Sequence, residues 1–236
     1  MSTGEMLTYQ GDKHTLNGYL ARPEGSGPFP AVVVIHEIFG LNDNIKDIAR
    51  RFADDGYVAL AVDLFVGRNR TVCMFRFMGQ MLLQSTNNES LRNLQKSLTF
   101  LSERTGVDTN RIGAIGFCMG GGFAIAWASN EPRLKAIAPF YAANPRPLEV
   151  AARGCPVVGS YPGKDFTTSQ GQKLDKALDS YNIPHDIKIY PNAKHSFFND
   201  QGQNYNAPAA QDSWQRVLNF FQEHVVNQPQ VSEPAP

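Results

Sequence analysis

Two periods of hydrophobic and polar residues alternate along the chain, and together they predict a layered α/β protein. Runs of consecutive apolar, β-branched residues are typical of strands buried on both faces of a parallel sheet. Stretches with apolar residues three or four positions apart are typical of helices that bury one face. The first unit consists of a strand at Ala31–Ile35, a helix at Asn44–Asp55 and a strand at Tyr57–Leu64. Such a unit predicts a right-handed crossover between parallel strands.

The same alternation continues to the end of the chain and predicts one open, mostly parallel sheet with helices on both faces. Before it, Met6–Gln10 and Leu16–Arg22 predict an antiparallel hairpin. The remaining predicted elements are a helix at Asn88–Arg104, a strand at Arg111–Phe117, a helix at Met119–Ser129, strands at Ala136–Tyr141 and Pro156–Tyr161, a helix at Thr167–Tyr181, a strand at His185–Tyr190 and a helix at Pro208–Val226.

Capping residues and breaks in the periodicity set the expected boundaries of these elements. Asp43 is the expected N-cap of the first helix, and Gly56 is expected to end it. The stretch from Phe65 to Asn87 has no clean period, so we expect an excursion over the sheet. With 236 residues the chain suits one domain, because single cores stop growing at about 250–300 residues. We expect that domain at 1–226 and a disordered, proline-rich tail at 227–236.

Composition and charge exclude several classes of function. The chain has 22 Lys+Arg against 22 Asp+Glu, so no strong basic field attracts nucleic acid. The N-terminus lacks an apolar leader and no run of about 18 apolar residues occurs, so we expect a cytoplasmic protein without a membrane partner, as a monomer or weak homodimer. The cysteines, Cys73, Cys118 and Cys155, are widely spaced, so neither a disulfide framework nor a metal site is expected, and Cys73 and Cys155 are interpreted as structural.

The string RIGAIGFCMGGG, Arg111 to Gly122, carries the strongest chemical signal. An apolar strand runs through a sharp glycine-flanked turn into a helix, which predicts a nucleophile elbow with Cys118 at its centre. Gly116 and Gly120 remove the side chains that such a turn would crowd. The N–H of Met119 then faces the same space as an oxyanion donor. A phosphate loop would require a Lys-Ser/Thr ending that this string lacks.

Two further residues follow the carboxyl ends of predicted strands. Asp165 lies in the loop PGKD and His195 in the loop PNAKHSF, so nucleophile, acid and histidine occur in the order found in α/β acyl-transfer enzymes. Taken singly, Asp165 is equally compatible with a cap of the helix near Thr167, and His195 with a surface residue. Their joint placement with Cys118 at one sheet edge favours a catalytic interpretation.

Glu37 follows the first central strand and lies at the same edge. A thiol with an ordinary pKa of about 8.5 is mostly protonated at neutral pH and needs a base or a cation to become thiolate. Glu37 is therefore a candidate gate for the nucleophile. The N–H of Ile38, directly after it, is the candidate second oxyanion donor.

The strings HEIFGLN and GFCMGGG, the Asp165 loop and the string HSF, in this order over residues 5–226, resemble the dienelactone hydrolase family. The resemblance implies a single-domain α/β-hydrolase fold and a Cys118-His195-Asp165 triad without metal or organic cofactor. It also implies that Glu37 holds the resting thiol and takes its proton when substrate binds. The implied activity is that of a carboxylic ester hydrolase acting on small esters or lactones, notably dienelactone, which opens to maleylacetate.

The chain also departs from that family. Members that accept the anionic lactone carry an arginine four residues after the histidine, where this chain has Asn199. A second family arginine is matched by Arg68, Arg70 or Arg76, of which we favour Arg76. Losing one buried carboxylate contact costs about 1.5–3 kcal/mol, so dienelactone is expected to be a poor substrate. An apolar pocket for a neutral ester is expected from Phe39, Phe75, Phe77, Tyr141 and Phe197.

Two alternatives remain beside the hydrolase. One is a non-catalytic α/β scaffold or redox-sensing thiol protein in which Cys118 is read by oxidation. A sensor needs neither His195 nor Asp165, which disfavours it. The other alternative is transfer of the acyl group to an acceptor other than water, through the same triad.

Overall fold

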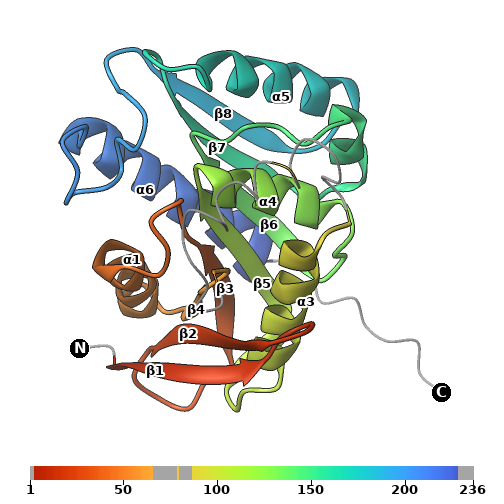
Figure 1. The fold of residues 1–236 in the computed structure, drawn as a ribbon, viewed down its shortest axis with the longest axis vertical. Coiled ribbons are helices and arrows are strands. Elements are labelled where there is room, and N and C mark those ends of the chain that lie inside the picture. The colour runs from red at the N-terminus through yellow and green to blue at the C-terminus, as the bar shows by residue number, and fades with distance from the viewer. Residues whose placement is uncertain (1–2, 66–78, 80–86, 228–236) are drawn as a thin grey trace.

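A mixed sheet forms the centre of the fold (Figure 1). The computed structural model describes residues 3–65, 79 and 87–227, and in this part of the chain the sheet has eight strands in the order β1-β2-β4-β3-β5-β6-β7-β8. The pairs β1–β2 and β2–β4 are antiparallel and all later pairs are parallel. The strands are β1 (Thr3–Gln10), β2 (Thr15–Arg22), β3 (Phe29–Ile35), β4 (Val58–Val62), β5 (Val107–Phe117), β6 (Leu134–Phe140), β7 (Val157–Pro162) and β8 (His185–Tyr190).

Helices cover both faces of this sheet. The helices and turns are α1 (Asp43–Asp54), α3 (Glu89–Ser102), α4 (Met119–Ala128), α5 (Thr168–Ser180), α6 (Ala207–Phe221), a 3-10 turn (Leu148–Arg153) and a π-helix (Gln222–Val226). Figure 1 shows α1 and α6 on one face and α3, α4 and α5 on the other. Each face forms its own apolar cluster. Along β3, Val33 and Ile35 join one cluster and Val32 and Val34 the other, as the period of two in a strand requires.

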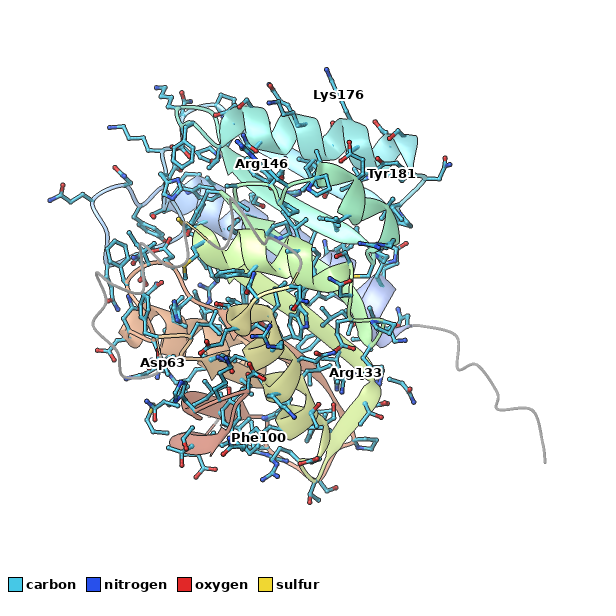
Figure 2. The ribbon with its side chains drawn as sticks, turned by 45° about the vertical axis from the view of Figure 1, so that its right-hand side comes forward. Asp63, Phe100, Arg133, Arg146, Lys176 and Tyr181 are labelled. Atoms are coloured by element: carbon cyan, nitrogen blue, oxygen red, sulfur yellow. The ribbon has the colours of Figure 1, made fainter. Side chains whose placement is uncertain are left out.

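The N-terminal hairpin is fixed to the helical layer by aromatic packing. Phe100 of α3, labelled in Figure 2, stacks on Tyr9 of β1 with ring centroids 4.4 Å apart. The Tyr9 hydroxyl also lies 2.8 Å from Ser97 Oγ. The buried Tyr9 ring and its hydrogen bond therefore fix β1, an edge strand, to α3. A two-stranded hairpin without such packing is only marginally stable.

The predicted fold class is confirmed, and the predicted helices and strands lie within a few residues of their expected bounds. One local prediction is wrong: the N-cap of α1 is Asn42, whose side chain accepts a hydrogen bond from Ile45 N, and Asp43 is already helical. Gly56, at φ 91°, follows the end of α1 as expected. The 3-10 turn was not predicted. The predictions for Arg68, Arg70, Cys73, Phe75, Arg76, Phe77 and the tail beyond residue 227 fall outside the described residues.

The topology brings four loops to one edge. Because β3, β5, β7 and β8 run parallel, their carboxyl ends meet at the same side of the sheet. The loops after these strands carry Glu37, Cys118, Asp165 and His195 respectively.

Candidate active site

Cys118 lies at the turn between β5 and α4. Its backbone has φ 53° and ψ −114°, a left-handed region that non-glycine residues rarely adopt. The Cys118 N–H donates to Phe140 O at 2.9 Å, and Gly122 N donates to Cys118 O at 3.2 Å. The turn is therefore held from both sides, and such contacts allow a strained backbone conformation to persist.

The flanking glycines are required by close backbone contacts. A Cβ at Gly116 would lie 2.2 Å from the Gly120 carbonyl oxygen, and a Cβ at Gly120 would lie 2.4 Å from Ile35 O. Both distances are shorter than any van der Waals contact. The elbow thus packs α4 directly against β3, the strand that leads to Glu37.

His195 and Asp165 form a hydrogen-bonded pair. His195 Nδ1 donates to Asp165 Oδ2 at 2.8 Å, and Asp165 also accepts from the Thr167 hydroxyl and N–H. Burial alone would raise the pKa of the Asp165 carboxyl, but the bonds from Thr167 and His195 outweigh it and hold the pKa below its ordinary value. An ionised Asp165 fixes the proton on Nδ1 and leaves Nε2 as the nitrogen that exchanges protons.

Glu37 is buried, with 4% of its surface exposed. Ser196 Oγ donates to its Oε1 at 2.9 Å. Burial raises the pKa of the Glu37 carboxyl, while Tyr141, Ser196, the His195 charge and Asn199 act in the opposite direction. The carboxyl is thus surrounded by polar groups from two separate loops, those after β6 and β8, which is the arrangement that an ionisable group needs inside a protein.

The Cys118 thiol lies among negative charges in a buried setting. Burial first, and the Glu37 charge second, raise the pKa of Cys118 to about 12, with a hydrogen bond from Met119 N acting in the opposite direction and Asp165 adding to the increase. At neutral pH the resting thiol therefore keeps its proton. A nearby base must remove that proton before the sulfur can act as a nucleophile.

Residues with strained backbone conformations lie close to Cys118 and Glu37. In the part of the chain that the structure describes, the non-glycine residues with positive φ are Cys118, Tyr141, Asn182 and Ser196. Three of these four adjoin the Glu37 carboxyl or carry the thiol. Strained residues cluster at functional sites because surrounding contacts hold them there.

The expected oxyanion donors lie at the two turns that carry Cys118 and Glu37. Met119 is the first residue of α4, where a backbone N–H has no acceptor within its own helix. Ile38 is 37% exposed in the turn after Glu37. That turn is braced by His36, whose Nε2 accepts from Leu64 N at 3.0 Å and whose Nδ1 lies 2.5 Å from Glu37 O. Because Nε2 accepts, the His36 proton is on Nδ1 and the ring is neutral.

The aromatic residues expected in the substrate pocket occupy different depths. Phe39 is 48% exposed, whereas Tyr141 and Phe197 are buried and pack against each other with centroids 5.5 Å apart. Phe197 therefore supports the site from beneath. The Tyr141 hydroxyl influences the Glu37 pKa, yet it is buried without a hydrogen bond of good geometry. Sequence reasoning missed Phe166, an exposed ring that stacks on His195, and Ser196.

Asn199, at the position of the expected family arginine, is buried within the same loop as His195. It accepts from Gln201 N at 3.0 Å and lowers the pKa of Glu37 through its side chain. In place of a cation for a substrate carboxylate, this position thus supplies a neutral group to Glu37.

The described residues contain neither a metal-binding cluster nor a membrane-spanning helix. No cluster of three His, Cys, Asp or Glu side chains that would hold a metal ion occurs in residues 3–65, 79 and 87–227. Nor does this part of the chain contain a helix with the length and apolar character needed to cross a bilayer.

Comparisons with known proteins match the chain to one protein family. The Dienelactone hydrolase family model matches residues 16–225. A relative from Saccharolobus solfataricus, named "Putative carboxymethylenebutenolidase", is 36% identical over 91% of this chain and 96% of its own length. A relative of the same name from Yersinia pestis is 35% identical over 92% of this chain and 86% of its own length.

Solved structures share the fold. A crystal structure described as a "Putative Dienelactone Hydrolase" from Klebsiella pneumoniae matches with a TM-score of 0.83 and 27% identity, covering 94% of this chain and 99% of that one. A dienelactone hydrolase-like promiscuous phosphotriesterase from metagenomic libraries also has a TM-score of 0.83, at 27% identity over 94% of this chain and 98% of that one. An acylaminoacyl peptidase from Pyrococcus horikoshii, at 14% identity and a TM-score of 0.77, covers 98% of this chain and 43% of that one and shows the α/β-hydrolase fold alone.

Proposed function

The chain belongs to the dienelactone hydrolase family of ester and lactone hydrolases, and we propose that it cleaves a small ester or lactone through Cys118, His195 and Asp165. One observation carries the proposal: the 2.8 Å bond between His195 Nδ1 and Asp165 Oδ2 lies at the sheet edge where Cys118 occupies a strained elbow. A nucleophile, a base and a group that orients the base are what acyl transfer requires.

The proposed acylation step moves one proton and exchanges one bond. Cys118 Sγ attacks the ester carbonyl while the N–H groups of Met119 and Ile38 bind the developing oxyanion. The thiol proton passes by way of Glu37 and His195 Nε2 to the leaving oxygen. The C–O bond breaks, the alcohol departs and a thioester remains on Cys118.

Deacylation reverses these roles. His195 Nε2 takes a proton from water, and the resulting hydroxide attacks the thioester carbonyl. The S–C bond breaks, the carboxylic acid leaves and the proton returns to Sγ. Asp165 keeps the imidazole oriented and stabilises its positive charge throughout.

Glu37 is the proposed first acceptor of the thiol proton. The observations that favour this role are its raised pKa, its influence on the thiol and the bond from Ser196 Oγ at 2.9 Å. A carboxyl whose pKa is raised is a better base than an ordinary glutamate. A resting thiol held protonated is also less open to oxidation.

The proposed substrate is a small, neutral ester or lactone. Asn199 replaces the arginine that would bind a substrate carboxylate, and its side chain acts on Glu37 instead. Exposed Phe39 beside the Ile38 N–H offers an apolar contact to the acyl half of such an ester. Dienelactone, which is anionic, is expected to be a poor substrate.

Hydrolysis of p-nitrophenyl acetate and of dienelactone by purified wild type and variants tests this function. We expect activity on the neutral ester and little on dienelactone. Cys118→Ala and His195→Ala should each reduce kcat by at least about a thousandfold, and the double variant no further, because triad members act as a unit. Cys155→Ala, a thiol outside the site, is the matched control and should retain activity.

The rival interpretations give other results. Additive losses in the double variant would contradict a triad. A redox-sensing thiol protein would show no turnover of any ester, yet a Cys118 that reacts with peroxide. Acyl transfer would appear as a product ester when an added alcohol or thiol competes with water.

A further inference from the structure

Exposed apolar side chains lie around the side of the sheet where the parallel strands have their carboxyl ends, which we call the reacting edge. In the described part of the chain the large exposed hydrophobic residues are Met6, Ile38, Phe39, Phe166 and Tyr205. Met6 lies on β1, away from this edge, whereas the other four lie in the loops that follow β3, β7 and β8. These loops also carry Glu37, Asp165 and His195, so the apolar rim and the polar centre belong to the same segments.

Phe166 has the most specific position in this rim. Its ring is stacked on the His195 imidazole, with an interplanar angle of 15° and centroids 5.5 Å apart. On the buried side, Tyr141 approaches the same imidazole at 5.0 Å and 55°. Phe166 is nevertheless 70% exposed, and only 25% of the His195 side chain is accessible. Much of the Phe166 ring thus remains free beside a partly covered histidine.

The chemistry of His195 determines which half of a substrate meets this ring. Because Nδ1 is bonded to Asp165, Nε2 is the nitrogen that gives its proton to the leaving oxygen, within about 3 Å. The alcohol half of an ester must therefore lie next to the imidazole. The acyl half lies on the other side of the carbonyl carbon that Cys118 attacks.

We propose that Phe166 forms a leaving-group subsite that favours esters whose alcohol half is flat and apolar, such as aryl or enol esters. The inference rests on the proposed function, because it takes His195 as the group that protonates the leaving oxygen. A flat ring stacked on Phe166 gains aromatic contact and removes apolar area from water. A small aliphatic alcohol gains neither.

The position of Phe166 directly after Asp165 gives the subsite a fixed geometry. The same turn holds both residues, since Asp165 O accepts from Thr168 N and Asp165 Oδ2 accepts from Thr167. One short segment therefore positions both the Asp165 carboxylate, which orients His195, and the Phe166 ring, which stacks on its face. The orientation of the base and the proposed substrate selectivity depend on the same turn.

Two substrate ratios measured on one enzyme preparation test the subsite. The leaving-group ratio compares kcat/KM for phenyl acetate with that for trifluoroethyl acetate, whose alcohol is acidic but carries no ring. The acyl ratio compares phenyl acetate with phenyl butyrate. Each ratio is independent of the fraction of active enzyme, so a folding defect does not change it.

We expect Phe166→Ala to lower the leaving-group ratio about 5- to 20-fold, mainly through KM for phenyl acetate, because it removes one stacking contact and its buried area. The acyl ratio should stay within about twofold. Phe166→Tyr should restore the leaving-group ratio. Tyr205→Ala, an exposed aromatic ring in the His195 loop, is the control and should change neither ratio. The inhibition constant of phenol should rise in Phe166→Ala alone.

Each failure has its own signature. An unchanged leaving-group ratio, or an equal fall in both ratios, would overturn the subsite. If phenyl acetate turnover survives in Cys118→Ala, the proposed function itself is wrong. If turnover depends on Cys118 but Phe166→Ala leaves the leaving-group ratio unchanged, only the proposed subsite is wrong.

Discussion

Cys118 combines a nucleophilic atom with two features that oppose its ionisation, burial and the neighbouring Glu37 carboxyl. For an acid, a raised pKa means that the protonated form is favoured in the folded protein. The thiol therefore contributes most to stability below its ordinary pKa of 9.0, and this contribution is lost as the pH rises through about 12. A thiol in this state needs a base to remove its proton before the sulfur can react as a nucleophile.

Glu37→Gln should separate the charge effect from the burial effect. Removing the carboxylate removes the second-largest cause of the raised thiol pKa, so alkylation of Cys118 by iodoacetamide should begin at lower pH than in wild type. Burial remains, so the pKa should stay above 9.0. Ester turnover should slow about tenfold or more, because the proposed base is lost. Bound ester should no longer alter the alkylation rate.

Peptide mapping of both cysteines in one sample provides the control for that experiment. Burial also raises the pKa of Cys155 to about 12, with no contribution from Glu37. Its alkylation profile should therefore be the same in wild type and Glu37→Gln. An identical Cys118 profile in both proteins, with unchanged turnover, would remove Glu37 from the gating role.

The residues at the reacting edge were predictable where strand order alone decides their position. Glu37, Cys118 and Asp165 each follow a buried strand, and parallel strands bring such positions together. Ser196 and Phe166 were missed because their roles depend on side-chain directions across loops. Nothing local in HSF or KDF indicates a 2.9 Å bond to Glu37 or a ring stacked on His195.

At the scale of elements, the apolar period located each central strand and helix but not every end. β8 has its predicted bounds, whereas β1 begins at Thr3, three residues before the predicted start. Its first residues, TGE, are polar, and they are strand because Thr3 pairs with Arg22. Partner strands, which no local pattern encodes, thus set the ends of edge strands.

The N-cap of α1 shows the same limit. Asn42 and Asp43 both have side chains that cap helices well, so the sequence alone does not choose between them. The backbone decides: Asn42 is extended, at φ −93° and ψ 180°, and the helix begins at the next residue. The cap also ends the turn that carries Glu37 and Ile38.

Asn42→Ala should reduce the free energy of unfolding by about 1 kcal/mol, because Ile45 N loses its side-chain acceptor. Asp43→Ala is the matched control. Its carboxylate is 82% exposed and pairs with Lys46 at 3.2 Å, an interaction worth about 0.3–0.5 kcal/mol. Urea unfolding of both variants measures the difference. A larger loss in Asp43→Ala would show that the cap is one residue later.

The whole molecule carries no net charge, with 22 basic and 22 acidic side chains. Long-range attraction of charged substrates depends on the summed field of a protein, which is weak here. Any preference for an anionic ester must therefore come from a local cation. Arg76, the favoured family arginine, lies outside the described residues and is the candidate for such a cation.

Salt dependence and Arg76→Ala together distinguish a local cation from a global field. For a neutral ester, kcat/KM should change less than about twofold between low salt and about 0.3 M salt. For dienelactone it should fall about threefold, because salt screens the attraction between a cation and the substrate carboxylate. Arg76→Ala should lower kcat/KM for dienelactone, remove its salt dependence and leave the neutral ester unchanged. The matched Arg68→Ala should change none of these values. Equal losses on both esters would exclude Arg76 from carboxylate binding, since a group that recognises charge acts only on the substrate that carries it.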